Sequence, residues 1–168
     1  FKDLFEESKS FSYESFDRNV SYTFVLQHPE NRIVKKLEAS RVVLVEANKM
    51  NGFHVYPLNI EEVKLEFFER GLLVEIPESK QFLTIEEARK GISKLSYEEQ
   101  GWVLKYDTIR TKIRNPRWKF VKDLRGNSNS ILRNYLELRQ NGFMKDYLDF
   151  FPEMQEKFQE YMVQVHKI

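Results

Sequence analysis

Three cations alternate along one predicted strand, and their type and spacing point most directly to chemistry. Arg110, Lys112 and Arg114 occupy every second position of the run from Ile109 to Arg114. Because strand side chains point alternately to opposite faces, the three cations share one face. A row of like charges is unfavourable unless it faces water or an anion. The strand therefore carries either a solvated hairpin face or a surface that binds a polyphosphate or a nucleic-acid backbone.

The elements that must position this strand add to its positive charge. Trp102 to Tyr106 is the predicted partner strand of a hairpin, and the chain reverses near Asp107-Thr108. Asn115-Pro116 ends the second strand, since proline favours the first position of a helix. A helix is predicted from Arg117 to Arg125, and only Asp107 and Asp123 offset the cations of this region. This density favours an anionic ligand.

Composition limits the class of protein. The chain has 168 residues, of which 41% are hydrophobic and 14% aromatic, so it can form the core of one compact domain with an appended helical piece. The net charge is +1, so any preference for a polyanion must come from local clustering. The absence of cysteine excludes disulfides and thiolate metal sites, and the histidines (His28, His54, His166) form no ligand spacing.

The sequence contains no apolar run long enough to span a membrane and no signal-peptide pattern. We therefore expect a cytoplasmic protein that does not bind a membrane, and we expect a monomer. The first residue is Phe rather than Met, which indicates that the sequence is a fragment or that residues precede it.

The remaining patterns predict scaffold elements. We expect strands at Tyr22–Gln27, Arg41–Ala47, Phe53–Tyr56 and Leu72–Ile76, and helices at Phe1–Ser10, from Asn59 to Gly71, from Thr84 to Leu95, and at Ile131–Gln140, Phe143–Phe151 and Pro152–Lys167. Aromatic residues recur through the last three helices. They either pack this piece onto the sheet or serve as stacking platforms for RNA.

Two stretches carry a family resemblance. QGWVLKY at positions 100–106, followed by RTKIRNPRWKFVKDLRGN at positions 110–127, resembles the last two nucleotidyltransferase motifs of ATP-dependent RNA ligases. These motifs run E-G-x-V and K-x-K on paired strands. YTFVLQHPENRIV, from Tyr22 to Val34, resembles the middle motif of that family, in which an aromatic-rich strand leads into P-x-N-R-I-V. The likeness is to the bacteriophage tRNA-repair ligases and their large-DNA-virus relatives.

The resemblance implies a fold and an activity. The fold would be α+β, with residues 1–126 forming the C-terminal portion of an antiparallel-sheet, ATP-grasp-like nucleotidyltransferase domain and residues 127–168 a helical appendage. The complete enzyme would adenylylate a lysine with ATP and Mg²⁺. It would then pass AMP to an RNA 5′-phosphate and seal that end to a 3′-hydroxyl, the RNA being tRNA or another broken RNA. The adenylylated lysine is expected upstream, so this chain alone should form no covalent adenylate.

The resemblance also implies roles for individual residues. Lys112 and Arg114 occupy the K-x-K positions and would be catalytic, holding nucleotide phosphates together with Lys105. Arginine at the second position keeps the charge and offers a planar fork suited to phosphate oxygens. Trp118 stands where relatives carry an aromatic residue that closes the nucleotide pocket. The residues that would bind the RNA backbone are Arg117, Lys119, Lys122, Arg125 and Arg32.

The chain departs from the family pattern at the metal-binding position. Gln100 replaces the glutamate of E-G-x-V, and an amide oxygen is a poorer ligand for Mg²⁺ than a carboxylate. Glu99 would face the opposite side of a strand unless a bulge brought it round. Val25 stands where relatives commonly carry an acidic residue, and Arg32 has a second reading as an ordinary surface cation beside a turn.

A lysine motif elsewhere is misleading. Lys49-Met50-Asn51-Gly52 fits the K-x-[D/N]-G pattern of the adenylylated lysine. However, it follows P-x-N-R-I-V instead of preceding it, and Asn-Gly is a strong hairpin signal. We therefore reject Lys49 as the nucleophile. An RNA- or nucleotide-binding module without catalysis remains an alternative, as does an α+β domain with no polyanion role.

Overall fold

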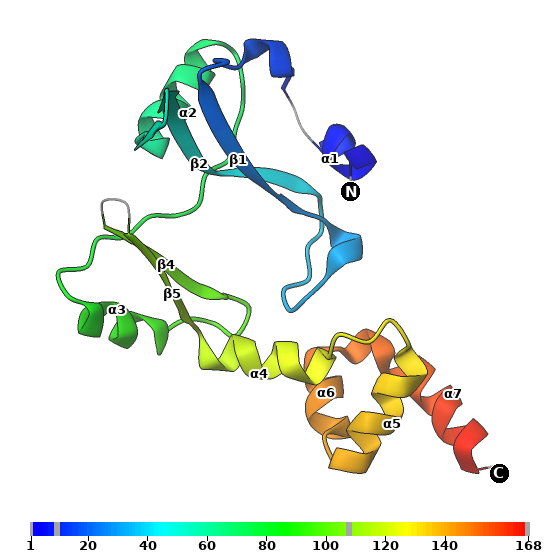
Figure 1. Ribbon diagram of the computed structural model, residues 1–168. Helices are drawn as coiled ribbons and strands as arrows, with labels where there is room; N and C mark the ends of the chain where they lie inside the picture. The colour runs from blue at the N-terminus through cyan, green and yellow to red at the C-terminus, as the bar shows by residue number, and fades with distance from the viewer. Residues whose placement is uncertain (1, 9–10, 107–108, 167–168) are drawn as a thin grey trace. The chain divides into compact units, whose positions relative to one another are not determined.

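The computed structural model describes residues 2–8, 11–106 and 109–166 (Figure 1). The chain forms two compact units: unit 1 comprises Phe1–Arg32 and Lys36–Phe82, and unit 2 comprises Ile33–Lys35 and Leu83–Ile168. The described residues form seven α-helices and two small antiparallel sheets, which confirms an α+β protein. The domain boundary that the family resemblance implies at residue 126 stays a prediction. The boundary between the two compact units follows residue 82.

Unit 1 is built on a three-stranded sheet in the order β1-β2-β3. Its elements are α1 (Lys2–Ser8), β1 (Val20–Gln27), β2 (Arg41–Asn51), β3 (His54–Pro57) and α2 (Ile60–Glu69), with 3-10 turns η1 (Tyr13–Ser15) and η2 (Pro29–Asn31). The strand predicted at Tyr22–Gln27 is confirmed within β1, where Tyr22, Phe24 and Leu26 are half-buried and pack against the core of this unit. The fully buried centre of that core includes Leu44 and Phe67.

Two predictions in unit 1 need correction. The β2–β3 hairpin forms, but Asn51 pairs with His54, so the turn residues are Gly52 and Phe53, one position later than predicted. Gly52 has φ +59°, a left-handed conformation that glycine adopts without steric cost. The strand predicted at Leu72–Ile76 is reduced to a single parallel bridge between Val43 and Glu75.

Unit 2 contains the second sheet and most of the helices. Its elements are α3 (Ile85–Ile92), β4 (Gly101–Tyr106), β5 (Ile109–Arg114), α4 (Pro116–Arg125), α5 (Ile131–Asn141), α6 (Met144–Phe150), the 3-10 turn η3 (Pro152–Met154) and α7 (Gln155–His166). The predicted reversal at Asp107-Thr108 lies outside the described residues. The helix predicted from Pro152 starts as η3 before α7 begins.

The helices α4 to α7 enclose one hydrophobic core. Trp118, Val121 and Leu124 of α4 are buried in it, with Val34 from the short segment that belongs to this unit. The tail aromatics Tyr135, Tyr147, Phe151 and Phe158 belong to the same cluster, as does Leu138. The packing role of these aromatics is therefore confirmed, although they pack around α4 and one another instead of onto a sheet.

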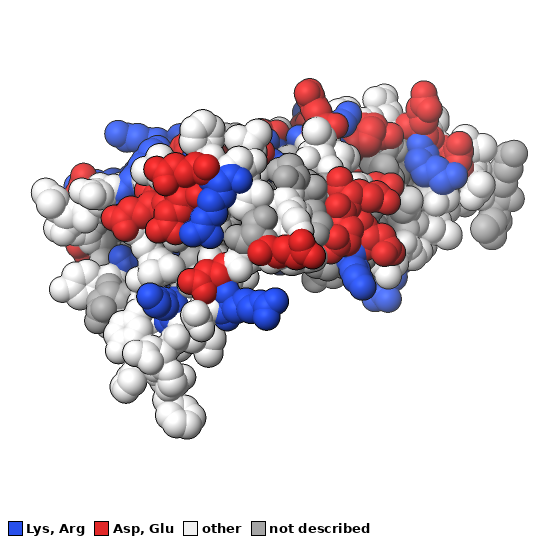
Figure 2. All heavy atoms as spheres, turned by 90° about the horizontal axis from the view of Figure 1, so that it is seen from above, with Lys and Arg blue, Asp and Glu red and all other residues white. Residues whose placement is uncertain are grey.

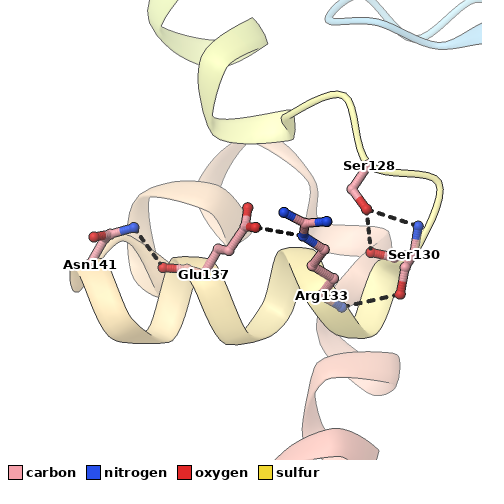
Figure 3. A network of polar contacts seen from close by, with 5 residues as sticks. All are labelled: Ser128, Ser130, Arg133, Glu137 and Asn141. Carbon is pink, nitrogen blue, oxygen red and sulfur yellow. Dashed lines mark hydrogen bonds and ion pairs between the residues drawn. The ribbon is translucent and has the colours of Figure 1, made fainter.

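Local polar contacts within and just before α5 stabilise this helix (Figure 3). The Ser130 hydroxyl accepts a hydrogen bond from the Arg133 backbone N–H at 3.3 Å, which caps the start of the helix. Arg133 Nε donates to Glu137 Oε1 at 2.8 Å, one turn further on. Gly142 ends the helix in a left-handed conformation, as predicted.

The β4–β5 hairpin starts at a glycine that no other residue can replace without strain. Gly101 has φ +126°, and a Cβ there would collide with the Ile113 carbonyl oxygen and stand 3.0 Å from the Asn115 nitrogen. The backbone of the first strand thus passes close to the end of the second.

Gly101→Ala should lower the free energy of unfolding of unit 2 by about 3 kcal/mol, because steric collision adds to a strained dihedral. Gly142→Ala is the matched control: its φ of +76° is also positive, but nothing lies within 4 Å of the added methyl. That change should cost about 1 kcal/mol. Denaturant unfolding followed by tryptophan fluorescence measures both, since the two tryptophans, Trp102 and Trp118, lie in unit 2. Equal losses would show that the collision is relieved by a shift of the backbone.

Candidate functional site

The hairpin register brings four cations to one face. Lys105 pairs with Arg110, and Val103 pairs with Lys112. Directly opposed residues of an antiparallel pair lie on the same face. Lys105, Arg110, Lys112 and Arg114 therefore share a face with Val103, and all five side chains are exposed. We call these four cations the cation face.

The cation face concentrates positive charge. The described residues of β4 and β5 include no Asp or Glu, and Lys105 stands directly opposite Arg110. Within the described part of the chain, Lys112 and Arg114 make no ion pair. An anion bound here would meet these two cations.

The other face of the hairpin is partly covered. Trp102, Leu104 and Ile113 are half-buried, and α3 lies beside both strands (Figure 1). Toward the tip the same face is open, because Tyr106 is 82% exposed and Ile109 is 67% exposed. The base of the hairpin is therefore covered, and the described residues nearest its tip are exposed.

A buried asparagine joins the hairpin to α4. Asn115 is 1% exposed, and its Nδ2 donates to the carbonyl oxygens of Ser96 at 2.7 Å and Glu99 at 3.0 Å. Its Oδ1 accepts the Arg117 backbone N–H at 3.0 Å and so caps α4. Its own N–H donates to the Gln100 carbonyl at 2.9 Å. One side chain thus fixes the turn before β4, the end of β5 and the start of α4.

Sequence reasoning identified this position only as a helix start. An Asn followed by Pro indicates a capped helix, but it does not reveal hydrogen bonds to residues that lie 16 and 19 positions earlier. The sequence signal that could have located them is the glycine at position 101, because a glycine permits another segment of backbone to approach closely.

The predicted metal ligands are not grouped with other ligands. Glu99 is exposed, and its carboxylate accepts the Ser96 backbone N–H at 3.0 Å. Gln100 is also exposed. Among the residues that the structure describes, no group of three or more His, Asp or Glu side chains is placed to hold a metal ion.

The cations of α4 differ in the contacts that they make with other residues of the chain. Lys119 Nζ lies 2.6 Å from Asp123 Oδ2, and this hydrogen bond lowers the pKa of the Asp123 carboxyl. Lys122 Nζ lies 6.0 Å from the centre of the Trp118 ring. Arg125 Nη1 is 3.4 Å from the Gly126 carbonyl oxygen. Arg117 is exposed in the first turn, directly after the cation face.

Other residues named in the sequence analysis lie in the helical core of unit 2 or belong to unit 1. Trp118 is 7% exposed in the helical core of unit 2, so its ring lies among core residues and not with the cation face. Arg32 is half-buried and belongs to unit 1. Val25 and Lys49 are exposed on β1 and β2 of the same unit. The structure therefore brings together Lys105, Lys112 and Arg114 of the predicted set, with the α4 cations following in the chain.

Charge elsewhere on the surface is mixed. On the face that Figure 2 shows, Asp and Glu side chains gather in several groups with Lys and Arg between them. On α5, Arg133 is paired with Glu137 (Figure 3). The net charge of +1 is thus an average over acidic and basic regions.

Comparisons with protein-family models, curated proteins and solved structures found no match to this chain. No helix among the described residues is long and apolar enough to cross a membrane.

Substitutions of Asn115 should separate its capping of α4 from its hydrogen bonds to the Ser96 and Glu99 carbonyls. Asn115→Ala should lower the free energy of unfolding of unit 2 by about 3 kcal/mol, since it removes a cap and leaves two carbonyls without their donor. Asn115→Ser retains a capping oxygen and should recover about 1 kcal/mol of that loss. Tryptophan-fluorescence unfolding gives both values. If Asn115→Ser matched the unchanged protein, the bonds to Ser96 and Glu99 would contribute nothing to stability.

Proposed function

We propose that this chain is the C-terminal portion of an ATP-dependent RNA ligase, a covalent nucleotidyltransferase that joins RNA 5′-phosphate and 3′-hydroxyl ends. The observation that carries the proposal is the cation face, where four exposed cations of one hairpin converge with no carboxylate on the described residues of either strand. The order of the motif residues along the chain supports the family assignment.

Phosphates are the ligand class that this face suits. Nucleotidyl transfer and strand sealing both bring a nucleophile toward a negatively charged phosphorus centre, and fixed cations lower that barrier. In the proposal Lys112 and Arg114 contact the phosphates of the nucleotide, with Lys105 beside them. Arg117 and Lys122 extend the positive surface toward the RNA backbone, whereas Lys119 is already paired with Asp123.

Mg²⁺ would enter this reaction with ATP, whose phosphate oxygens supply hard ligands. The donors at Gln100 and Glu99 do not fit a dedicated magnesium site, because one is an amide and the other already accepts the Ser96 N–H. We therefore assign no step to a metal held by these two residues.

A second candidate function is an RNA- or nucleotide-binding module without catalysis. Gln100 favours it, because an exposed amide stands where the family carries a metal-binding carboxylate. Both candidates require the cation face to bind phosphates, so they share one binding test and differ in a test of turnover.

Lys112→Ala should weaken binding of a 5′-phosphorylated single-stranded RNA about tenfold at low salt, because it removes one charge-assisted phosphate contact. The slope of log affinity against log salt should become shallower by about 0.7. Fluorescence anisotropy over a salt series measures both. Lys145→Ala is the matched control, since Lys145 is exposed on α6 outside the proposed surface. Lys119→Ala should have a smaller effect than Lys112→Ala, because Asp123 already neutralises this lysine. Equal effects of Lys112→Ala and Lys145→Ala would refute the assignment.

A turnover test distinguishes the two candidates. Incubation with ATP and Mg²⁺ should add the mass of one AMP to a longer polypeptide that contains this chain and the proposed upstream lysine, and nothing to the 168-residue chain. In the longer polypeptide Lys112→Ala should abolish sealing, and Gln100→Glu should raise it. No adduct on either polypeptide would favour the binding module. An adduct on the short chain would return Lys49 to consideration.

A further inference from the structure

An aromatic pocket opens at the start of α4, next in the chain to the cation face. It has a volume of about 300 Å³ and is lined by Tyr97, Pro116, Arg117, Phe120 and Phe150. All five residues belong to unit 2. This is the lower end of the size range of small-molecule sites.

The rings of the pocket form an edge-to-face array. The Tyr97 and Phe150 ring centres lie 4.9 Å apart at 62°, and those of Phe120 and Phe150 lie 6.3 Å apart at 77°. Tyr97 and Phe150 pack against the margin of the helical core, whereas Phe120 is 44% exposed. Aromatic surface is therefore left open to a ligand on the solvent side.

A cation stands beside this aromatic surface. Arg117 and Phe120 are three residues apart on α4, a spacing that places two side chains on the same side of a helix. Among the described residues that line the pocket, Arg117 is charged and none carries a carboxylate. The guanidinium of Arg117 can therefore contact a flat, electron-rich ring that is stacked on Phe120.

The pocket lies a short distance along the chain from the cation face, where phosphates are proposed to bind. Arg114, the last cation of the cation face, is three residues before Arg117, so their Cα atoms are at most about 11 Å apart. A ligand that combines an aromatic ring with an attached phosphate matches both surfaces, while an apolar peptide matches only one.

We propose that this pocket binds one unpaired nucleobase of a single-stranded RNA whose phosphates lie on the cation face. The proposal rests on the phosphate-binding function argued above and names the form of the substrate, a single-stranded end instead of a duplex. Base stacking on aromatic rings is tolerant of sequence. The pocket should therefore select for an unpaired base without strong preference among the four bases.

The test compares two 5′-phosphorylated RNA oligonucleotides of equal length, one intact and one with a series of abasic positions. The 168-residue chain should bind the intact oligonucleotide about tenfold more tightly. Phe120→Ala should weaken binding of the intact RNA by about the same factor and leave binding of the abasic RNA almost unchanged. In a double-mutant cycle this non-additivity indicates a direct contact between Phe120 and a base. Its salt slope should stay unchanged, because no phosphate contact is removed. Phe120→Tyr keeps an aromatic ring and should restore binding.

Phe143→Ala is the matched control, because Phe143 is 43% exposed in the same unit and does not line the pocket. If Phe120→Ala bound both oligonucleotides as tightly as the unchanged chain while Lys112→Ala still lost affinity, the base-binding pocket would be wrong and the phosphate-binding function would stand. If no RNA bound at low salt, both would be refuted. A change in sedimentation mass on Phe120→Ala with unchanged RNA affinity would identify a second copy of the chain as the occupant.

Discussion

The hydrogen bonds of the buried Asn115 side chain are the interactions on which the candidate surface of unit 2 depends. This side chain satisfies two carbonyls of the turn before β4 and caps α4, while Gly101 lets the two strands' backbones approach within the distance these bonds require. A buried amide with both its donor and acceptor engaged holds its neighbours in one geometry, since any shift would leave a polar group unpaired. The cation face, the first turn of α4 and the aromatic pocket all begin within a few residues of this point.

Charge and packing are divided between the two sides of the hairpin. Its half-buried face gives the strands a base beside α3, and the opposite face carries four cations. That concentration of positive charge is the physical argument for an anionic ligand. On α4 and α5 the chain pairs Lys119 with Asp123 and Arg133 with Glu137. Lys112 and Arg114 stand on strands whose described residues offer no such partner.

The two candidate functions differ in one chemical group. An enzyme of the proposed class needs a hard ligand near the transferred phosphoryl group, and at the motif position where that class carries a carboxylate this chain has the amide of Gln100. A binding module needs only the cation face and a platform for bases. Both uses require the same rigid hairpin, so the scaffold by itself favours neither, and turnover in a longer polypeptide decides between them.

The sequence by itself determined the local elements, because their signals are local. Alternation placed the cations of β5 on one face, and Asn115-Pro116 and Gly142 marked helix ends through backbone groups within one turn. It also predicted the β2–β3 hairpin, missing the turn by one residue. Tertiary structure alone decided which cations are already paired, that Trp118 lies in a core, and that Tyr97, Phe120 and Phe150 form a pocket. These outcomes depend on contacts between residues far apart in the chain, whose geometry no spacing rule contains.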